Sequence, residues 1–441
     1  MAKATYSFPR GFLWGTATAS QQAEGQNINN NWSAWETQPG RIREGHKAGL
    51  ACDWWGGRWK EDFDRAKETG QNAHRLSIEW SRIQPTPDRW DEDALDHYRQ
   101  MVRGLVDRGM TPMVTLHHFS DPLWLVDRGG WESPETPALF EAYTRKVVEA
   151  LKSYVSLWCT INEPNVYTVC SYLTGEFPPG KTDLNATSQV YINLVKGHVL
   201  SYKAIHEIQP AAQVSIAMNY NGFEPSRPWF FLDTFLSNFM TSNFNYAFPM
   251  ALKTGKLNFA AKRTSIPEAA GTMDYYGLNY YTVQKVAFVL KPKDMFFRRF
   301  FPEGSELSPT GFIANRPDGF FKAMQFANSF DLPIYITENG VEDPEDTFRP
   351  KYTVQHIHQM WRAVNYTYPI RGYFHWTLVD NFEWERGWTQ RFGLWGLNVD
   401  TQERIRRKSV DVYARICKEN AISSDMVAEY IPGLLPVLFP D

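Results

Sequence analysis

Cysteine is scarce in this sequence, and long apolar segments are missing from it. Only four of the 441 residues are cysteine, and they form no C-x-x-C pair. This scatter favours reduced thiols over a disulfide framework. No apolar run approaches the about 20 residues that cross a bilayer, and the N-terminus lacks the apolar core and cleavage pattern of a secretion signal. We therefore expect a cytoplasmic protein without a membrane partner.

The sequence also lacks an excess of charge of either sign. Its formal net charge is −3, whereas nucleic-acid-binding domains usually carry a basic patch or stripe. We therefore expect no nucleic-acid partner. Metal-binding patterns are missing too: no H-E-x-x-H occurs, and the pairs His117–His118 and His356–His358 have spacings whose side chains diverge. We expect no metal and no cofactor, and the oligomeric state stays open.

Aromatic residues are plentiful. The chain has 17 Trp, 21 Tyr and 29 Phe, and hydrophobic residues make up 43% of it. Most of these aromatic rings should pack in the core. A minority can offer flat apolar faces to a ligand, and the C–H faces of sugar rings suit such platforms.

Short β-rich runs alternate with stretches of helical periodicity. The runs are "FLWGTATA", "AHRLSIEW", "MVTLHHF", "LWCTINEP", "VSIAMN", "YYGLNYYT", "IYITENG" and "GYFHWTLVD". The clearest helix is expected in Asp91–Gly109, where acidic residues open the segment and Arg108–Gly109 closes it. The residues expected on one apolar face of this helix are Leu95, Tyr98, Val102, Leu105 and Val106.

This alternation predicts βαβ units around a parallel sheet. Eight units favour a closed (β/α)8 TIM barrel in the α/β class, as a single catalytic domain over residues 1–441. The alternative is an open doubly wound sheet. The count of eight, and the lack of a glycine-rich phosphate fingerprint after the first run, favour the barrel.

Chemically active side chains gather where these runs end. They are Gln22, Arg75, His118, Asn162, Glu163, Asn279, Tyr281, Glu338 and Trp376. In a barrel the carboxyl ends of the strands share one face, which carries the active site. Any barrel has some polar residues there, since strands must exit into water. Two carboxylates, an arginine, a histidine and two asparagines on one face predict catalysis.

Two carboxylates across a small cavity can cleave a glycosidic bond. One must be protonated to donate to the leaving oxygen, and the other must be ionised to attack the anomeric centre. Glu163 and Glu338 end the fourth and seventh runs, and only a closed barrel brings such strands face to face. Arg75 and Tyr281 are possible neighbours of Glu338. A cation and a hydroxyl donor would hold that carboxylate ionised, as a nucleophile requires.

At this point the sequence resembles a known family. "TINEP" (Thr160–Pro164) and "ITENG" (Ile336–Gly340) look like the two signatures of glycoside hydrolase family 1, the β-glucosidase family. Further stretches, in the family's order along nearly the whole chain, are similar to its other motifs: "FLWGTATASQQAEG", "HRLSIEWSRIQP", "GLNYYT" and "VDNFEWERGWTQRFGLWGLNVD".

The resemblance implies a retaining β-glycosidase, without a cofactor, that removes terminal non-reducing β-D-glucosyl residues by double displacement. Its substrates would be small β-glycosides or cello-oligosaccharides, as in cellulose degradation, with some β-galactosidase and β-fucosidase activity. Glu338 would be the nucleophile, oriented by Arg75 and Tyr281, and Glu163 the acid/base. The implied sugar-binding residues are Gln22, His118, Asn162, Asn279, Tyr281, Trp376, Glu383 and Trp384.

Several positions bear on substrate choice. Phe312 stands where many family members carry Trp, which leaves the aglycone preference open. The stretch "KPKDMFFRRFFPEG" before it is expected to be an ordered loop packed on the barrel, with a rim of the cleft or a subunit contact as the alternative. Glu383 favours unphosphorylated sugars, because a carboxylate repels a phosphate. The alternative function is a 6-phospho-β-glucosidase.

Two other classes of function are weighed against this one. A carbohydrate-binding protein without turnover would need neither carboxylate. A nucleotide-binding loop is suggested by "GEFPPGKT" (Gly175–Thr182), which fits G-x-x-x-x-G-K-[ST]. That loop binds phosphates through backbone N–H groups, and Pro178 and Pro179 remove two of these donors. No β-run leads into Gly175, and Asp183–Ser188 is a poor helical continuation. Both classes are disfavoured.

Overall fold

The computed structural model describes residues 4–291 and 296–440. Residues 1–3 of the N-terminus, residues 292–295 of the aromatic and basic stretch, and residue 441 lie outside the described residues. None of the described helices is both long and apolar enough to cross a membrane.

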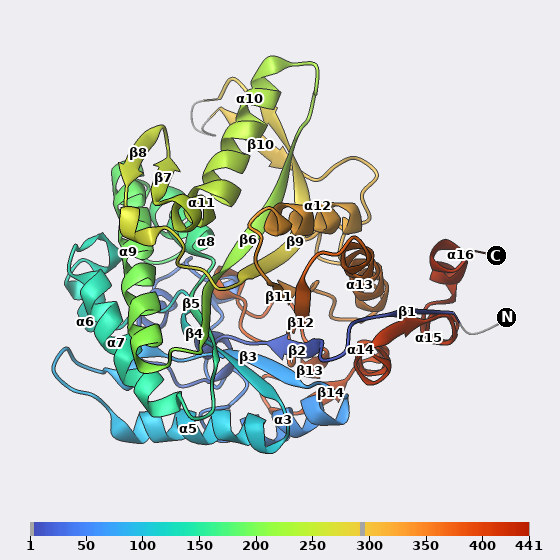
Figure 1. Ribbon diagram of the computed structural model, residues 1–441, viewed down its shortest axis with the longest axis horizontal. Coiled ribbons are helices and arrows are strands. Elements are labelled where there is room, and N and C mark those ends of the chain that lie inside the picture. Colours follow the sequence, from blue (N-terminus) through green and yellow to red (C-terminus); the bar gives the residue numbers. More distant parts are fainter. Residues whose placement is uncertain (1–3, 292–295, 441) are drawn as a thin grey trace.

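Eight parallel strands form a closed barrel (Figure 1). They are β2 (Leu13–Ala17), β3 (Ala73–Ser77), β4 (Thr111–His117), β5 (Leu157–Asn162), β6 (Gln213–Pro225), β9 (Tyr276–Phe288), β11 (Ile334–Asn339) and β12 (Ile370–Trp376). Each strand pairs with its neighbour along the chain, and β12 pairs with β2 to close the ring. Each of the eight β-rich runs contributes one strand, so the predicted (β/α)8 barrel is confirmed.

Helices separate the strands and cover the outside of the barrel (Figure 1). They are α1 (Ser20–Ala23), α2 (Asn31–Trp35), α3 (Trp59–Glu68), α4 (Trp80–Ile83), α5 (Glu92–Asp107), α6 (Leu123–Asp127), α7 (Thr136–Leu151), α8 (Pro164–Thr168), α9 (Leu184–Ile208), α10 (Phe231–Met240), α11 (Ala247–Thr254), α12 (Pro317–Asn328), α13 (Arg349–Asn365), α14 (Lys408–Glu419), α15 (Ser424–Tyr430) and α16 (Leu435–Leu438). The shorter strands are β1 (Thr5–Ser7), β7 (Lys256–Phe259), β8 (Lys262–Ser265), β10 (Phe297–Phe300), β13 (Trp395–Leu397), β14 (Arg404–Arg406) and β15 (Ala421–Ser423).

Helix α5 forms where the sequence predicts it. The Asp91 side chain caps it by accepting from the N–H of Ala94 at 2.9 Å, and Gly109 follows the helix in the left-handed region at φ 71°. Capping oxygens at the first turn and glycine after the last are the usual helix boundaries. One position on the expected face is wrong. Val106 is exposed. Successive residues of a helix point in different directions, so Leu105 and Val106 cannot both face the barrel.

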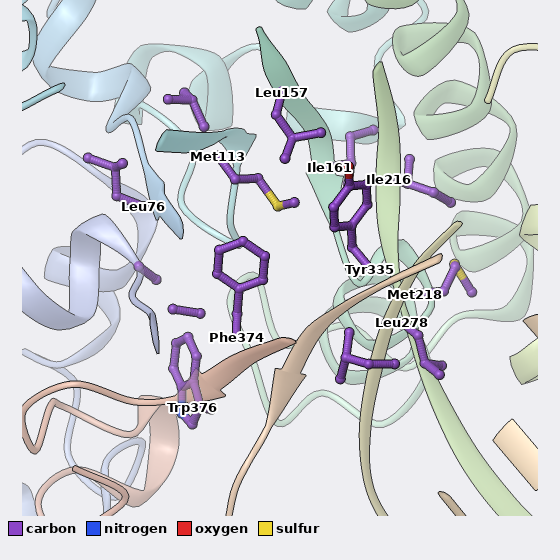
Figure 2. Close-up of a cluster of buried hydrophobic side chains, with 14 of the residues drawn as sticks. Leu76, Met113, Leu157, Ile161, Ile216, Met218, Leu278, Tyr335, Phe374 and Trp376 are labelled. Atoms are coloured by element: carbon purple, nitrogen blue, oxygen red, sulfur yellow. The ribbon is translucent and has the colours of Figure 1, made fainter. Parts of the chain in front are cut away.

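Large apolar side chains fill the barrel interior. Met113 of β4, Leu157 of β5, Tyr335 of β11 and Phe374 of β12 are buried and converge in the space between the strands (Figure 2). Side chains of alternate strands stack in layers in such barrels, which makes the interior a packed core rather than a pore. The packed layers fix the strand ends, and those ends carry the polar residues described next.

Strands β6 and β9 run further than their β-rich runs predict. Each has 13 residues, and beyond an irregularity at Tyr220–Gly222 their ends pair with each other up to Pro225 and Val286. Strand β10 then pairs antiparallel with the end of β9. These extensions, with helix α10, rise above the barrel at the top of Figure 1. Part of the "KPKDMFFRRFFPEG" stretch is therefore a strand and not a loop.

Candidate active site

Eight of the residues singled out in the sequence line one cavity of about 350 Å³. They are His118, Asn162, Glu163, Tyr281, Glu338, Trp376, Glu383 and Trp384. The other three, Gln22, Arg75 and Asn279, are buried behind them and bonded to them. The residues come from seven different strands or the loops after them, so the closed barrel is what brings them together.

Glu338 lies at the end of β11 between a cation and a hydroxyl. Arg75 Nη1 is 2.6 Å from Glu338 Oε1, and the Tyr281 hydroxyl donates to Oε2 at 2.7 Å. Burial raises the pKa of Glu338, but the Arg75 charge and the Tyr281 hydrogen bond oppose that rise. Burial also works against the charge of Arg75, yet Glu338 keeps the pKa of the guanidinium above its usual value. Each partner thus favours the charged form of the other against the cost of burial.

The dipeptide Asn339–Gly340 follows Glu338. Asn-Gly is a common hairpin turn, but here both residues pack against neighbouring strands. Asn339 still belongs to β11 and donates to the carbonyl of Tyr280 at 2.8 Å. A Cβ on Gly340 would lie 2.0 Å from the backbone oxygen of Trp376. Only glycine allows β12 to approach this closely, so Gly340 fixes the distance between Glu338 and the Trp376 ring.

Glu163 follows β5 in a strained conformation. Its φ of 42° and ψ of 59° are left-handed, which non-glycine residues seldom adopt. The next residue, Pro164, disfavours the right-handed helical region for the residue before it and starts helix α8. The backbone N–H of Glu163 donates to the Ala217 carbonyl at 2.7 Å, which holds the turn and aims the side chain into the cavity.

The surroundings of Glu163 differ from those of Glu338. Its Oε1 accepts from the amides of Asn279 at 2.8 Å and Asn219 at 2.9 Å, both neutral donors. Burial, and then the nearby negative charge of Glu338, raise the pKa of Glu163 to about 8. Glu163 is therefore set up to carry a proton at neutral pH, whereas a cation and a hydroxyl at Glu338 favour its ionised form.

Asn162 and His118 form the wall between the two glutamates and the aromatic rings. Asn162 Oδ1 accepts from Arg75 at 2.6 Å, and its amide contacts His118 Nε2 at 2.9 Å. Burial and the Arg75 charge hold the pKa of His118 well below its usual value, so the ring is neutral. With Nε2 accepting, the proton sits on Nδ1, which has no hydrogen-bond partner within residues 4–291 and 296–440.

Glu383 lines the cavity, and Gln22 is buried behind it. Gln22 Nε2 donates to Glu383 at 3.1 Å and to the Phe382 carbonyl at 2.8 Å. Burial and the charges of Glu385 and Glu338 raise the pKa of Glu383 well above its usual value. Trp376 and Trp384 lie within 6.0 Å of the His118 ring at shallow angles and line the same cavity. The arrangement offers flat apolar faces edged by hydrogen-bonding groups.

Asn279 is bonded to other side chains of the site. Its amide nitrogen donates to Glu163 and to Asn162, and its oxygen accepts from Thr337 at 2.6 Å. It does not line the cavity. Its amide hydrogens and its oxygen are therefore engaged by neighbouring side chains of the site.

Sequence reasoning missed Asn219. Asn219 is the last residue of the fifth β-rich run, "VSIAMN". Its side chain donates to Glu163, as the side chain of Asn279 does. Its position at a strand end was the available signal. The pattern alone did not separate it from an ordinary polar residue at a strand exit.

Phe312, which stands where many family members carry Trp, lines the cavity. Arg386 lies 4.4 Å above the Phe312 ring, and Arg299 of strand β10 also lines the cavity. The alternative interpretation of the aromatic and basic stretch, as a rim of the cleft, therefore holds for Arg299. Arg386 is itself paired with Glu385 at 3.2 Å.

The stretch Gly175–Thr182 does not have the shape of a phosphate loop. It follows a π-helical turn (Val169–Leu173) and not a strand, and helix α9 begins only at Leu184. The expectation that Asp183–Ser188 is poor helical sequence was wrong, because Asp183 caps α9 by accepting from the N–H groups of Asn185 and Ala186. An N-cap signal was available there.

Comparisons with known proteins agree with this geometry. The model of the family described as "Glycosyl hydrolase family 1" matches residues 4–422. Beta-glucosidase A of Thermotoga maritima is 32% identical over 94% of this chain and 98% of its own, and a beta-galactosidase of Pyrococcus woesei is 28% identical over 97% and 100%. A solved beta-glycosidase from Pyrococcus horikoshii superimposes with a TM-score of 0.90 at 34% identity, covering 97% of this chain and 98% of that one. Beta-glucosidase from Thermotoga maritima in complex with glucoimidazole has a TM-score of 0.89 at 31% identity, covering 95% and 100%.

Proposed function

The chain belongs to glycosyl hydrolase family 1, and from that premise we propose that it is a retaining β-glucosidase with Glu338 as nucleophile and Glu163 as acid/base. One observation carries the assignment of roles. Glu338 is paired with a guanidinium and a hydroxyl, whereas Glu163 faces the same cavity with amide donors. The carboxylate with a cation attacks, and the carboxyl without one carries the proton.

In the first step the Glu338 carboxylate forms a bond to the anomeric carbon while the glycosidic bond breaks. Glu163 gives its proton to the departing oxygen, so the aglycone leaves as a neutral alcohol. This leaves a glycosyl ester on Glu338 and a carboxylate on Glu163. The ester carries no charge, so the repulsion that raised the pKa of Glu163 is gone.

In the second step Glu163 acts as a base. It takes a proton from water, and the water oxygen bonds to the anomeric carbon as the ester bond to Glu338 breaks. The sugar is released with its configuration retained, since the anomeric carbon has been inverted twice. Arg75 and Tyr281 then receive the restored carboxylate, and Asn279 and Asn219 hold Glu163 in place for both steps.

The rest of the cavity supports a sugar as the bound group. His118 Nδ1 and Gln22 Oε1 are buried polar atoms without partners among the described residues, and each can bond a hydroxyl. Trp376 gives a flat face to the sugar ring, with Asn162, Glu383 and Trp384 as further ligands. The same set of donors can accept more than one hydroxyl arrangement, so β-galactosides and β-fucosides are expected as additional substrates.

Exchange of each glutamate for glutamine tests the roles separately. Glu338→Gln should reduce turnover of every substrate by at least about 1,000-fold, because the nucleophile is lost. Glu163→Gln should cost about 100- to 10,000-fold on an alkyl glucoside, whose leaving group needs a proton. It should cost far less in the glycosylation step on a p-nitrophenyl glucoside, whose leaving group departs unprotonated. If both variants lost the same activity on both substrates, the assignment of the two roles would be wrong.

Plain and phosphorylated substrates separate the two subclasses. We expect p-nitrophenyl β-D-glucoside to be hydrolysed in strong preference to its 6-phosphate. Glu383 lies in the cavity, and the adjacent Arg386 is already paired with Glu385. Preference for the phosphate would make the enzyme a 6-phospho-β-glucosidase. Both glutamate roles would survive that result.

The wider setting is proposed on the same basis. Residues 1–441 form one catalytic domain that releases glucose from β-glucosides and cello-oligosaccharides in the cytoplasm, as a late step of cellulose degradation. The cavity supports a small-molecule substrate, and the proposed mechanism uses no cofactor. Hydrolysis of cellobiose and longer cello-oligosaccharides, measured by glucose release, tests the substrate class directly.

A further inference from the structure

Helix α10 is inverted with respect to the usual amphipathic helix. Its buried side chains are polar, Asp233 and Ser237, whereas Phe231, Phe235 and Phe239 lie one turn apart along the exposed side. A surface helix normally turns its apolar stripe to the core and its polar side chains to water. In α10 the apolar stripe is left without a partner in the described chain.

Hydrogen bonds fix this orientation. The Asp233 carboxylate accepts from the Arg227 guanidinium at 2.8 Å and from the backbone N–H of Phe288 at 2.8 Å. One turn later, the Ser237 hydroxyl donates to the Phe223 carbonyl at 2.9 Å. Rolling the helix to bury its phenylalanines would break all of these bonds and leave a buried carboxylate unpaired, which is costly.

The exposed apolar side chains of α10 and of the chain segments next to it are called the apolar crest. It comprises Trp229, Phe231, Phe235, Phe239, Leu290 and Phe296. Trp229, Phe231 and Phe235 expose 81%, 72% and 61% of their surface, and Leu290 exposes 82%. The bond from Phe288 to Asp233 places the end of β9, and with it Leu290, beside the start of α10. Clustered exposed aromatic side chains of this kind mark an interaction surface.

Cations border the crest. Lys291 and Arg298 are exposed, and neither has an ion pair with any residue of 4–291 or 296–440. Arg227 lies 4.5 Å from the Phe230 ring at the other border. The chain as a whole is slightly acidic, so this local positive charge is hidden in the net charge of −3.

We propose that the apolar crest docks the enzyme onto an anionic lipid bilayer, in the plane of the headgroups. Interfacial helices have a stripe of Trp, Phe and Leu that enters the acyl boundary, with Lys and Arg on the headgroups. Helix α10, which carries three of the crest residues, lies at the top of Figure 1, away from the barrel strands. A two-fold contact between copies of this chain would bring like cations together, whereas anionic headgroups neutralise them.

The crest also lies beside the mouth of the cavity, because strand β10 supplies Arg299 to the cavity lining and follows Phe296 of the crest. A docked molecule therefore holds its active site next to the lipid surface. The expectation of no membrane partner came from the absence of spanning segments and of net charge, and neither feature tests for a helix that lies in the interface.

Co-sedimentation with vesicles tests the proposal. The native chain should sediment with vesicles of phosphatidylglycerol and phosphatidylcholine. It should bind less to vesicles of phosphatidylcholine alone, and less to the mixed vesicles at about 1 M salt, where the screening length is about 3 Å. The double variant Phe231→Ser/Phe235→Ser should lower the partition coefficient at least about tenfold, because two large apolar side chains no longer enter the bilayer. Lys291→Gln/Arg298→Gln should weaken binding to the anionic vesicles alone.

The matched control is Tyr366→Ser/Val437→Ser, whose side chains are 60% and 66% exposed in other parts of the fold. It should change the partition coefficient by less than about twofold. Thermal melting of each variant checks that it is folded. The proposal is overturned if the native chain does not sediment, or if the control loses as much binding as the crest variant. It is also overturned if light scattering shows that the crest variant splits a native dimer and vesicle binding is unaffected, since the crest would then cover a second copy.

Discussion

Removal of a single hydroxyl from Tyr281 should move one side of the pH–rate profile and leave the other in place. In the proposed mechanism the active form has Glu338 ionised and Glu163 protonated. The acidic limb of kcat/KM then reports Glu338, and the alkaline limb reports Glu163, whose pKa burial and Glu338 raise to about 8. Tyr281→Phe deletes the 2.7 Å bond that the hydroxyl donates to Glu338 and keeps the ring.

The size of the shift follows from the bond that is lost. A hydrogen bond to a charged group contributes about 1.5–3 kcal/mol, and about 1.4 kcal/mol corresponds to one pKa unit. The bond favours the ionised form, so its loss raises the pKa of Glu338 and moves the acidic limb to higher pH. The cavity admits water, which can replace part of the bond, so we expect a shift of about one unit. The alkaline limb should stay near pH 8, because the charge of Glu338 that raises the pKa of Glu163 is unchanged.

The measurement is kcat/KM for p-nitrophenyl β-D-glucoside across the pH range in native and variant enzyme. Tyr280→Phe is the matched control. Tyr280 is the adjacent residue on β9, and its hydroxyl donates to the Arg316 carbonyl at 2.6 Å, on the opposite side of the strand from the carboxylates. An unmoved acidic limb in Tyr281→Phe, or an equal shift in Tyr280→Phe, would refute the reasoning. A loss of activity without a shift would show that Tyr281 acts on geometry alone.

Three further perturbations test other parts of the structure. Asn219→Ala removes a donor that favours ionised Glu163, so the alkaline limb should move upward from about pH 8 by up to about one unit in the same assay. Gly340→Ala would place a methyl group 2.0 Å from the Trp376 carbonyl oxygen, and should lower kcat/KM at least about tenfold through displacement of Trp376 and Glu338. Arg404→Ala removes the buried partner 2.7 Å from Asp62, and should lower the free energy of unfolding by about 3 kcal/mol in urea titrations, with activity at low temperature retained. An unchanged alkaline limb, an unimpaired glycine variant or an unaltered unfolding midpoint would each contradict the corresponding contact.

The barrel and the pair of glutamates could be predicted from the sequence because their signals are local. Each β-rich run is short, and helix α5 has its cap and its closing glycine within the segment itself. Glu163 and Glu338 stand in short motifs whose neighbours, Pro164 and Gly340, shape the backbone directly. Such features depend on the backbone conformation of a few adjacent residues, which the side chains of those residues set.

The contacts that distinguish the two glutamates required the tertiary structure. Both are buried carboxyls at strand ends, and they differ by which side chains from other strands reach them. Arg75 of β3 reaches Glu338, and Asn219 of β6 reaches Glu163. The sequence named Arg75 as a possible neighbour of Glu338, whereas nothing in it separated Asn219 from an ordinary polar residue at the end of a run. A pKa depends on burial and on charges a few ångströms away, and no pattern along the chain contains those distances.

Helix α10 is a second feature whose orientation only the tertiary structure shows. The sequence of this segment has phenylalanines at helical spacing, and such a stripe predicts a face turned to the core. Only the bonds of Asp233 to Arg227 and Phe288 show that the stripe faces outward. The sequence by itself determined which segments become strands and helices and which residues could do chemistry. The closed barrel decided which of those residues meet and which faces stay exposed, because contacts between distant segments exist only after the chain has folded.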